Sequence, residues 1–275
     1  MGNEKYWEIK AKSSDLGEVW IYGEISSFKW SDSDVTPKDF QKELKSIESV
    51  KQLDIYINSG GGSVFAGQSI YSMLKRHKAN KTVYVDGLAA SIASVIAMAG
   101  DRIVMPKNAM MMIHNASMLG IGDYRDFRKY ADDLEKINGS IISTYAEKTD
   151  MDITEIANLM DEETWMSADD AVRYGFADEI ENTKKVAASI DGDFLICNNE
   201  KFDLSMYKNP PEIKNETDNT QTNDEPSEPG EPDSPGETNE NRGESQPVSD
   251  NTQEINAQRT KMYELRRKIN QIEED

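Results

Sequence analysis

Cysteine is nearly absent from this sequence, since Cys197 is the only one among its 275 residues. No disulfide can therefore form within the chain, which fits a reducing compartment such as the cytoplasm. Long apolar runs are also missing. No stretch reaches the 18 apolar residues typical of a membrane helix, and the polar Met1–Tyr6 is not followed by the apolar run of a signal peptide. We therefore expect no membrane partner and no signal peptide.

Basic residues are outnumbered, with 31 Lys and Arg against 51 Asp and Glu, which gives a formal net charge of −20 and argues against nucleic acid as a partner. The acidity is uneven. Residues 209–250 hold 12 acidic residues against Lys214 and Arg242, and seven of the nine prolines. Because this segment has almost no apolar side chains to bury, we expect it to be disordered. The sequence predicts a globular domain over 1–205, an acidic, proline-rich disordered linker over 206–250 and a short amphipathic helix over 251–275.

Strand-like and helix-like segments alternate in the first 205 residues, which predicts an α/β fold. The apolar and β-branched runs predict strands at 19–23, 53–58, 82–86, 102–105 and 110–113. Helical spacing and capping residues predict helices at 36–50, around 70–74, from 91, at 123–148, at 151–160 and from 167. The apolar positions of the 251–275 helix extend over only about three heptads, so it is equally a solvated helix or an oligomerisation element.

The stretch Gly87–Ser94 places Ser91 at the start of an apolar run of small residues. A hydroxyl at the first turn of a buried helix lies near free backbone N–H groups and the positive end of the helix dipole. That environment suits a nucleophile whose attack leaves negative charge on a carbonyl oxygen. The alternative is a serine that only caps the helix.

Histidine is rare, with only two in the chain, so a general base has only two candidates, His77 and His114. His77 lies in the polar segment Lys75–Asn80, where we expect it to be exposed. His114 ends the predicted 110–113 strand, where a sheet can aim its ring toward Ser91. No lysine has a position that nominates a serine–lysine dyad instead.

Three consecutive glycines, Gly60–Gly62, follow the 53–58 strand and precede a helix. Such a turn lets the backbone approach a ligand and present N–H donors. No Lys-Ser/Thr pair follows, and the Gly-x-Gly-x-x-Gly pattern is absent, so both nucleotide-binding loop patterns fail. A plain tight turn is the remaining alternative.

Together, five motifs in order resemble the ClpP family of serine proteases, and most closely the ClpP-like head-maturation proteases of tailed phages. The resemblance covers about residues 15–182 and implies a ClpP/crotonase-like fold of repeated β-β-α units. The motifs are Ile57–Gly62 with Ala66–Gly67 and Ile70–Tyr71, Gly87–Ser91, Met112–His114, Trp165–Ala168 and Tyr174–Asp178.

This resemblance implies a serine endopeptidase with Ser91 as nucleophile and His114 as general base, and no metal or cofactor. It also implies an oxyanion hole made by the backbone N–H groups of Gly62 and Ile92. The third member would be Glu163, where the family has Asp.

Two neighbouring acids, Asp161 and Glu162, are alternatives for that third position. The acidic cluster is otherwise interpreted as a solvated turn between two helices.

Several departures from the family pattern bear on partners. Gly60 and Ala116 stand where the family has proline, and the polar N-terminus shows no recognisable axial loops. Docking to an ATP-driven unfoldase is therefore not carried over. The 123–148 helix corresponds to the family's handle, which implies self-association into heptameric or double rings.

The resemblance thus implies a protease that cleaves capsid or scaffold proteins during phage head maturation, in the host cytoplasm or inside an immature capsid. The acidic linker would tether it near its substrates. The alternatives are an ATP-dependent Clp proteolytic subunit for general degradation, a non-enzymatic capsid assembly protein on the same fold, and a crotonase-type enzyme acting on acyl-CoA.

Overall fold

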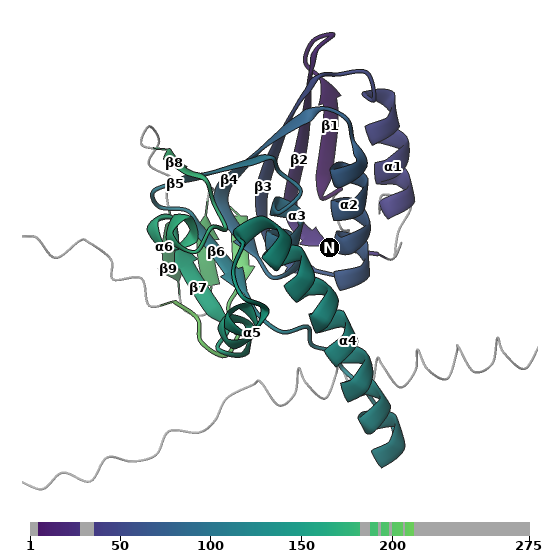
Figure 1. Ribbon diagram of the computed structural model, residues 1–275, viewed down its shortest axis with the longest axis vertical. Coiled ribbons are helices and arrows are strands. Elements are labelled where there is room, and N and C mark those ends of the chain that lie inside the picture. Colours follow the sequence, from purple (N-terminus) through teal and green to yellow (C-terminus); the bar gives the residue numbers. More distant parts are fainter. Residues whose placement is uncertain are drawn as a thin grey trace, which may run out of the picture. The chain divides into compact units, whose positions relative to one another are not determined.

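The computed structural model has a mixed α/β fold, as the alternation of segments predicts (Figure 1). The structure describes residues 5–27, 36–181, 188–191, 194–197, 200–205 and 207–211. These residues all belong to one unit, Met1–Asn219. Apart from 207–211, the predicted 206–250 linker and 251–275 helix lie outside the described residues, and both stay predictions.

The elements follow one another in an order that places most helices between strands. The strands are β1 (Trp7–Ala11), β2 (Leu16–Ile25), β3 (Gln52–Gly62), β4 (Asn80–Ala90), β5 (Arg102–Pro106), β6 (Met110–Ile113), β7 (Thr164–Ser167), β8 (Glu179–Glu181), β9 (Ala188–Asp191), β10 (Phe194–Cys197) and β11 (Glu200–Asp203). The helices are α1 (Pro37–Ser46), α2 (Val64–Arg76), α3 (Ile92–Ala97), α4 (Tyr124–Thr149), α5 (Ile153–Asp161) and α6 (Ala168–Arg173).

The main sheet is built around β4, a long strand that pairs with different neighbours along its length. Strands β1-β2-β3-β4-β5-β8 form the continuous order, and all pairs in it are parallel except β1 with β2. The first half of β4 pairs with β5, whereas its last residues, Leu88–Ala90, pair in parallel with β6. Strand β7 then pairs antiparallel with β6. The sheet therefore divides at β4, and β6 and β7 form its second branch.

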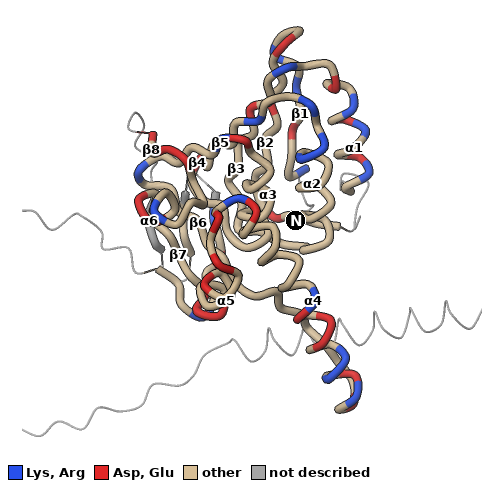
Figure 2. Tube along the Cα trace, viewed as in Figure 1, with Lys and Arg blue, Asp and Glu red and all other residues tan. Residues whose placement is uncertain are grey.

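Helix α3 lies in the centre of the core, and all six of its side chains are buried. Its close neighbour is α2, where a side-chain carbon at Gly67 would lie 2.2 Å from Ile92 Cγ1. Only glycine permits this approach. Figure 2 shows Lys, Arg, Asp and Glu on α1 and on the outer part of α4, whereas α3 carries none. The short apolar run after Ser91 is therefore a fully packed helix.

The expected helix at 123–148 is confirmed as α4, with Asp123 as its N-cap. Only its C-terminal part enters the core, through Ile141 and Tyr145. Tyr124 and Phe127 at its start are 63% and 52% exposed, and this end projects away from the sheet (Figure 1). Within the described part of the chain, no helix is long and apolar enough to cross a membrane.

Six strands of the described residues were not expected from the sequence: β1, β7, β8, β9, β10 and β11. Strand β1 directly follows the polar Met1–Tyr6, and β7 has only four residues directly after the acidic cluster at 161–163. The interpretation of that cluster as a turn between two helices is wrong, because the chain passes from α5 into β7. The strands and helices expected within the described residues are present at their predicted places.

Candidate active site

Strand register brings three of the predicted site residues to one edge of the sheet. Ala90 of β4 is the partner of Met112 of β6, so the residues after these strands, Ser91 and His114, leave the sheet side by side. Ile113 of β6 is the partner of Thr164 of β7. Because β7 runs antiparallel, Glu163 enters the sheet at the same edge where His114 leaves it.

Ser91 occupies the sharp turn between β4 and α3. Its φ is +55°, a backbone conformation rare for residues other than glycine, and its N–H donates to the Met112 carbonyl at 2.9 Å. Although Ser91 is the N-cap of α3, its side chain makes no capping hydrogen bond. The hydroxyl Oγ instead lies 2.8 Å from His114 Nε2. The interpretation of Ser91 as only a capping serine therefore fails, and a strained strand-to-helix turn that presents a serine hydroxyl is typical of nucleophiles.

His114 is partly buried, with 21% of its side chain exposed. Burial lowers the pKa of its imidazole below the ordinary value, and the nearby Lys208 acts in the same direction. Glu163 opposes both by raising this pKa. A neutral imidazole at neutral pH is the form that can accept a proton from a serine hydroxyl.

Glu163 faces the other nitrogen of the same ring, at 3.8 Å from Oε2 to His114 Nδ1. This distance exceeds a hydrogen bond, so the interaction is electrostatic. The Glu163 carboxylate is buried and accepts two backbone N–H groups, from Lys208 at 3.0 Å and from Asn209 at 2.8 Å. Its own backbone has a φ of +52°.

The neighbouring acids are directed elsewhere. Asp161 accepts a hydrogen bond from the Asn115 side-chain amide at 2.6 Å, and Glu162 is exposed. Of the three candidate acids, the structure therefore places Glu163 against His114.

The glycine turn contacts Ser91 through Gly61, its middle residue, to which the sequence assigned no separate role. Its φ is +101°, and a side-chain carbon there would lie 2.7 Å from Ser91 Cβ. At Gly62, with φ +138°, such a carbon would instead meet the Ile25 backbone. Ile92 is the first residue of α3, directly after Ser91. The turn thus lies against the serine, and the oxyanion-hole role of the Gly62 and Ile92 amides stays a prediction.

The expectation that His77 is exposed is wrong. His77 is 9% exposed at the C-terminal end of α2, where its backbone N–H donates to Leu74 and its Nδ1 accepts from Ala79 N–H at 3.2 Å. Burial lowers the pKa of this imidazole too. The flanking cations reach solvent while the ring between them packs inward, so flanking charge was a poor guide to burial.

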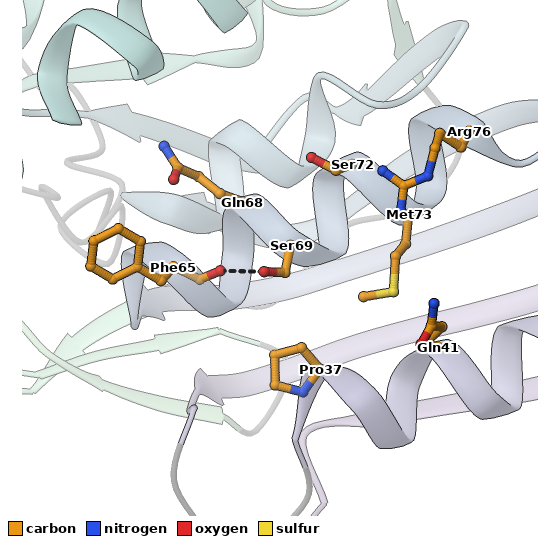
Figure 3. Close-up of a pocket in the computed structure, with 8 residues that line it drawn as sticks. All are labelled: Pro37, Gln41, Phe65, Gln68, Ser69, Ser72, Met73 and Arg76. Atoms are coloured by element: carbon orange, nitrogen blue, oxygen red, sulfur yellow. Dashed lines mark hydrogen bonds between the residues drawn. The ribbon is translucent and has the colours of Figure 1, made fainter. Parts of the chain in front are cut away.

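Outside this site, the described residues form a cavity between two helices but no metal site. Among them, no group of three or more His, Cys, Asp or Glu side chains is arranged to hold a metal ion. A cavity of about 460 Å³ opens between α1 and α2 (Figure 3). It is lined by polar and apolar residues of those helices and contains none of Ser91, His114 or Glu163.

The sequence profile of the Clp protease family matches residues 38–184, more than half of the chain and all of the Ser91–His114–Glu163 cluster. The chain belongs to the Clp protease family. This is a family of serine-type peptidases, which agrees with the resemblance found in the motifs.

Individual proteins of this family are also similar in sequence to this chain. The chain is 36% identical to the ATP-dependent Clp protease proteolytic subunit of Leuconostoc citreum over 142 residues, 50% of this chain and 70% of the relative. It is 31% identical to the protein of the same name from Deinococcus radiodurans, over 50% of this chain and 68% of that relative. It is also 31% identical to the one from Bacteroides thetaiotaomicron, over 54% of this chain and 69% of that relative.

One part of the site lies beyond the segment matched by the Clp protease family. Tyr207 donates a hydrogen bond from its hydroxyl to the Gly60 carbonyl at 2.9 Å, and its ring lies 5.9 Å from the His114 ring. Lys208 and Asn209 hold Glu163 as described above. Sequence reasoning missed these residues, because they border the acidic, proline-rich segment and carry no motif.

Proposed function

We propose that this protein is a serine endopeptidase in which Ser91, His114 and Glu163 act together. The observation that carries the proposal is the 2.8 Å contact between Ser91 Oγ and His114 Nε2, held in place by the pairing of β4 with β6. A nucleophile within hydrogen-bond reach of a base, with a third group beside the base, is the arrangement that acyl transfer needs.

In the proposed reaction, Ser91 Oγ bonds to the carbonyl carbon of a peptide while His114 Nε2 accepts the hydroxyl proton. The backbone N–H groups of Gly62 and Ile92 would stabilise the resulting oxyanion. His114 then gives the proton to the leaving amine, the peptide C–N bond breaks, and an acyl-enzyme remains. Water, activated by the same imidazole, releases the second product and restores Ser91.

Glu163 has an electrostatic role in this scheme. When Nε2 accepts a proton, the ring becomes an imidazolium, and the carboxylate 3.8 Å from Nδ1 stabilises that charge. The carboxylate does not have to take a proton itself.

For the biological substrate, we propose capsid or scaffold proteins that are cleaved during phage head maturation, in the host cytoplasm or within an immature capsid. The composition of residues 206–250 supports this, because an acidic tether raises the local concentration of a substrate without adding contacts. We further propose that the chain assembles into rings, with the exposed start of α4 at the contact between them.

A second candidate function is general protein degradation together with an ATP-driven unfoldase. The printed names of the relatives, ATP-dependent Clp protease proteolytic subunits, favour it. The two functions share the same chemistry and differ in substrate and partner.

Covalent labelling by a fluorophosphonate tests the chemistry. The full-length protein should be labelled at Ser91, and Ser91→Ala should abolish the labelling. Ser69→Ala is a matched control, because Ser69 on α2 bonds only the Phe65 carbonyl and lies outside the site. Unlabelled, assembled wild-type protein would favour the non-enzymatic assembly role.

Co-expression separates the two candidate substrates. Wild type and Ser91→Ala are each expressed together with phage capsid and scaffold proteins, and the products are identified by mass spectrometry. Processing that Ser91→Ala prevents supports head maturation. Cleavage of folded proteins only with an unfoldase and ATP would support the degradative function instead.

A further inference from the structure

The C-terminal segment Tyr207–Asn209 lies after the last residue matched by the Clp protease family, Lys184, yet it contacts the candidate site at three places. These contacts go to the acid, to the glycine turn and to the histidine ring. The proposed reaction does not require them, so they call for a separate explanation.

The first contact fixes the Glu163 carboxylate. Its two oxygens accept separate backbone N–H groups, Oε2 from Lys208 and Oε1 from Asn209. Backbone amides cannot rotate away as side chains do, so these two donors hold both carboxylate oxygens in place. The Asn209 side chain also donates to the Glu162 carbonyl at 2.8 Å, which joins the segment to the same turn.

The second contact is made by Tyr207. Its hydroxyl donates to Gly60 at the start of the glycine turn, while its ring lies beside His114 and packs edge-on against Trp165 at 5.3 Å. Burial and the charge of Glu163 raise the pKa of this phenol to about 12, so it stays a hydrogen-bond donor at neutral pH. One side chain therefore touches both the turn beside Ser91 and the base.

The segment is held by a small apolar core of its own. Leu195, Phe202 and Leu204, which precede Tyr207, are buried together with side chains of β4 and β6. These partners are Leu88, Ala90 and Met112, the residues at the ends of the strands that deliver Ser91 and His114. Such packing anchors the segment to the strand ends instead of leaving it as a loose flap.

We propose that Tyr207–Asn209 is a positioning element of the active site. The amides of Lys208 and Asn209 hold Glu163 at a fixed place beside His114 Nδ1, and Tyr207 holds the glycine turn in register with the His114 ring. This matters for glutamate in particular, since its extra side-chain torsion gives it more positions to adopt than aspartate has. The proposal rests on the proposed function, because it assigns the segment to that same site.

A proline substitution tests the amides within the full-length chain. Asn209→Pro removes the N–H that binds Glu163 Oε1, whereas the matched Asn209→Ala keeps it; both lose the side-chain bond to Glu162. Relative to Asn209→Ala, we expect Asn209→Pro to lower kcat for an unstructured peptide about tenfold, with KM within about twofold.

The pKa of His114 gives a readout that does not need activity. The chain has only two histidines, so NMR titration resolves His114 from His77. Glu163 raises the pKa of His114 and Lys208 lowers it, while Ser91 and Tyr207 face the ring as uncharged groups. A less fixed Glu163 should therefore leave the pKa of His114 lower in Asn209→Pro than in Asn209→Ala. Equal kcat and equal pKa in the two variants would overturn the proposal.

Tyr207→Phe tests the second contact, and it decides the matter if Asn209→Pro does not fold. The substitution keeps the aromatic ring and removes only the hydroxyl. We therefore expect the rate of fluorophosphonate labelling to be about three- to tenfold lower, with an unchanged oligomeric state. Labelling at the wild-type rate would overturn the role of Tyr207. If wild type itself is not labelled, the proposed function fails, while the NMR comparison still reports whether the segment positions Glu163.

Discussion

The two halves of the candidate site are built in different ways. Ser91 and His114 directly follow paired parallel strands, and their side chains meet at 2.8 Å. Glu163 lies in a turn before a four-residue strand, stops 3.8 Å short of His114, and is held by amides from a distant segment. The register of the sheet fixes Ser91 and His114, whereas the position of Glu163 depends on hydrogen bonds from a distant segment. We therefore expect substitutions in the first half to cost more.

The largest expected effect belongs to the base. His114→Ala should lower kcat/KM for peptide hydrolysis by a factor on the order of 10³ or more, because no other described group contacts the Ser91 hydroxyl as a base. His77→Ala is the control, because His77 is the other histidine of the chain and lies outside the site. Equal activity of His114→Ala and wild type, measured in steady-state assays, would remove His114 from the mechanism.

A smaller effect is expected at the acid. Glu163→Gln keeps the shape of the side chain and removes its charge, so we expect about a 10²-fold loss of kcat, less than for His114→Ala. Asp161→Asn is the matched control, because Asp161 bonds Asn115 and not His114. A loss as large as that of His114→Ala would break the contrast between the two halves and make the acid an equal member of the triad.

The smallest expected effect is a shift along the pH axis. Because burial lowers the pKa of His114, its neutral, proton-accepting form persists to lower pH than for a free imidazole. The acidic limb of kcat/KM against pH should therefore have its midpoint below about 6.5. In Glu163→Gln the limb should move lower still, since the group that raises the pKa is gone. A midpoint above 6.5 in wild type would show that the carboxylate, and not burial, dominates at His114.

The same contrast explains what the sequence could predict. The apolar runs that become β4 and β6 are visible by composition, and the residues after them, Ser91 and His114, follow from the strand ends. Strand β7 is too short for its pattern to be seen beside an acidic cluster, so Glu163 came from resemblance alone.

The remaining errors share a cause. His77 was misplaced because its neighbours along the chain are charged, and Tyr207 was missed because its neighbours are prolines and acids. In both places a side chain makes contacts that its neighbours in the sequence do not predict. The surroundings of these two side chains are set by tertiary contacts, whereas the prediction rested on local composition.

The location of Tyr207–Asn209 in the chain also sets an order in time. Asn209 follows His114 by 95 residues. At a synthesis rate of roughly 5–20 residues per second, that separation corresponds to about 5–19 s on the ribosome. On the proposal above, a nascent chain already carries its nucleophile and its base during that interval but lacks the segment that fixes the acid. Full hydrolytic competence would then arrive only after the whole Clp-like domain has been made, a delay that protects neighbouring nascent proteins from premature cleavage.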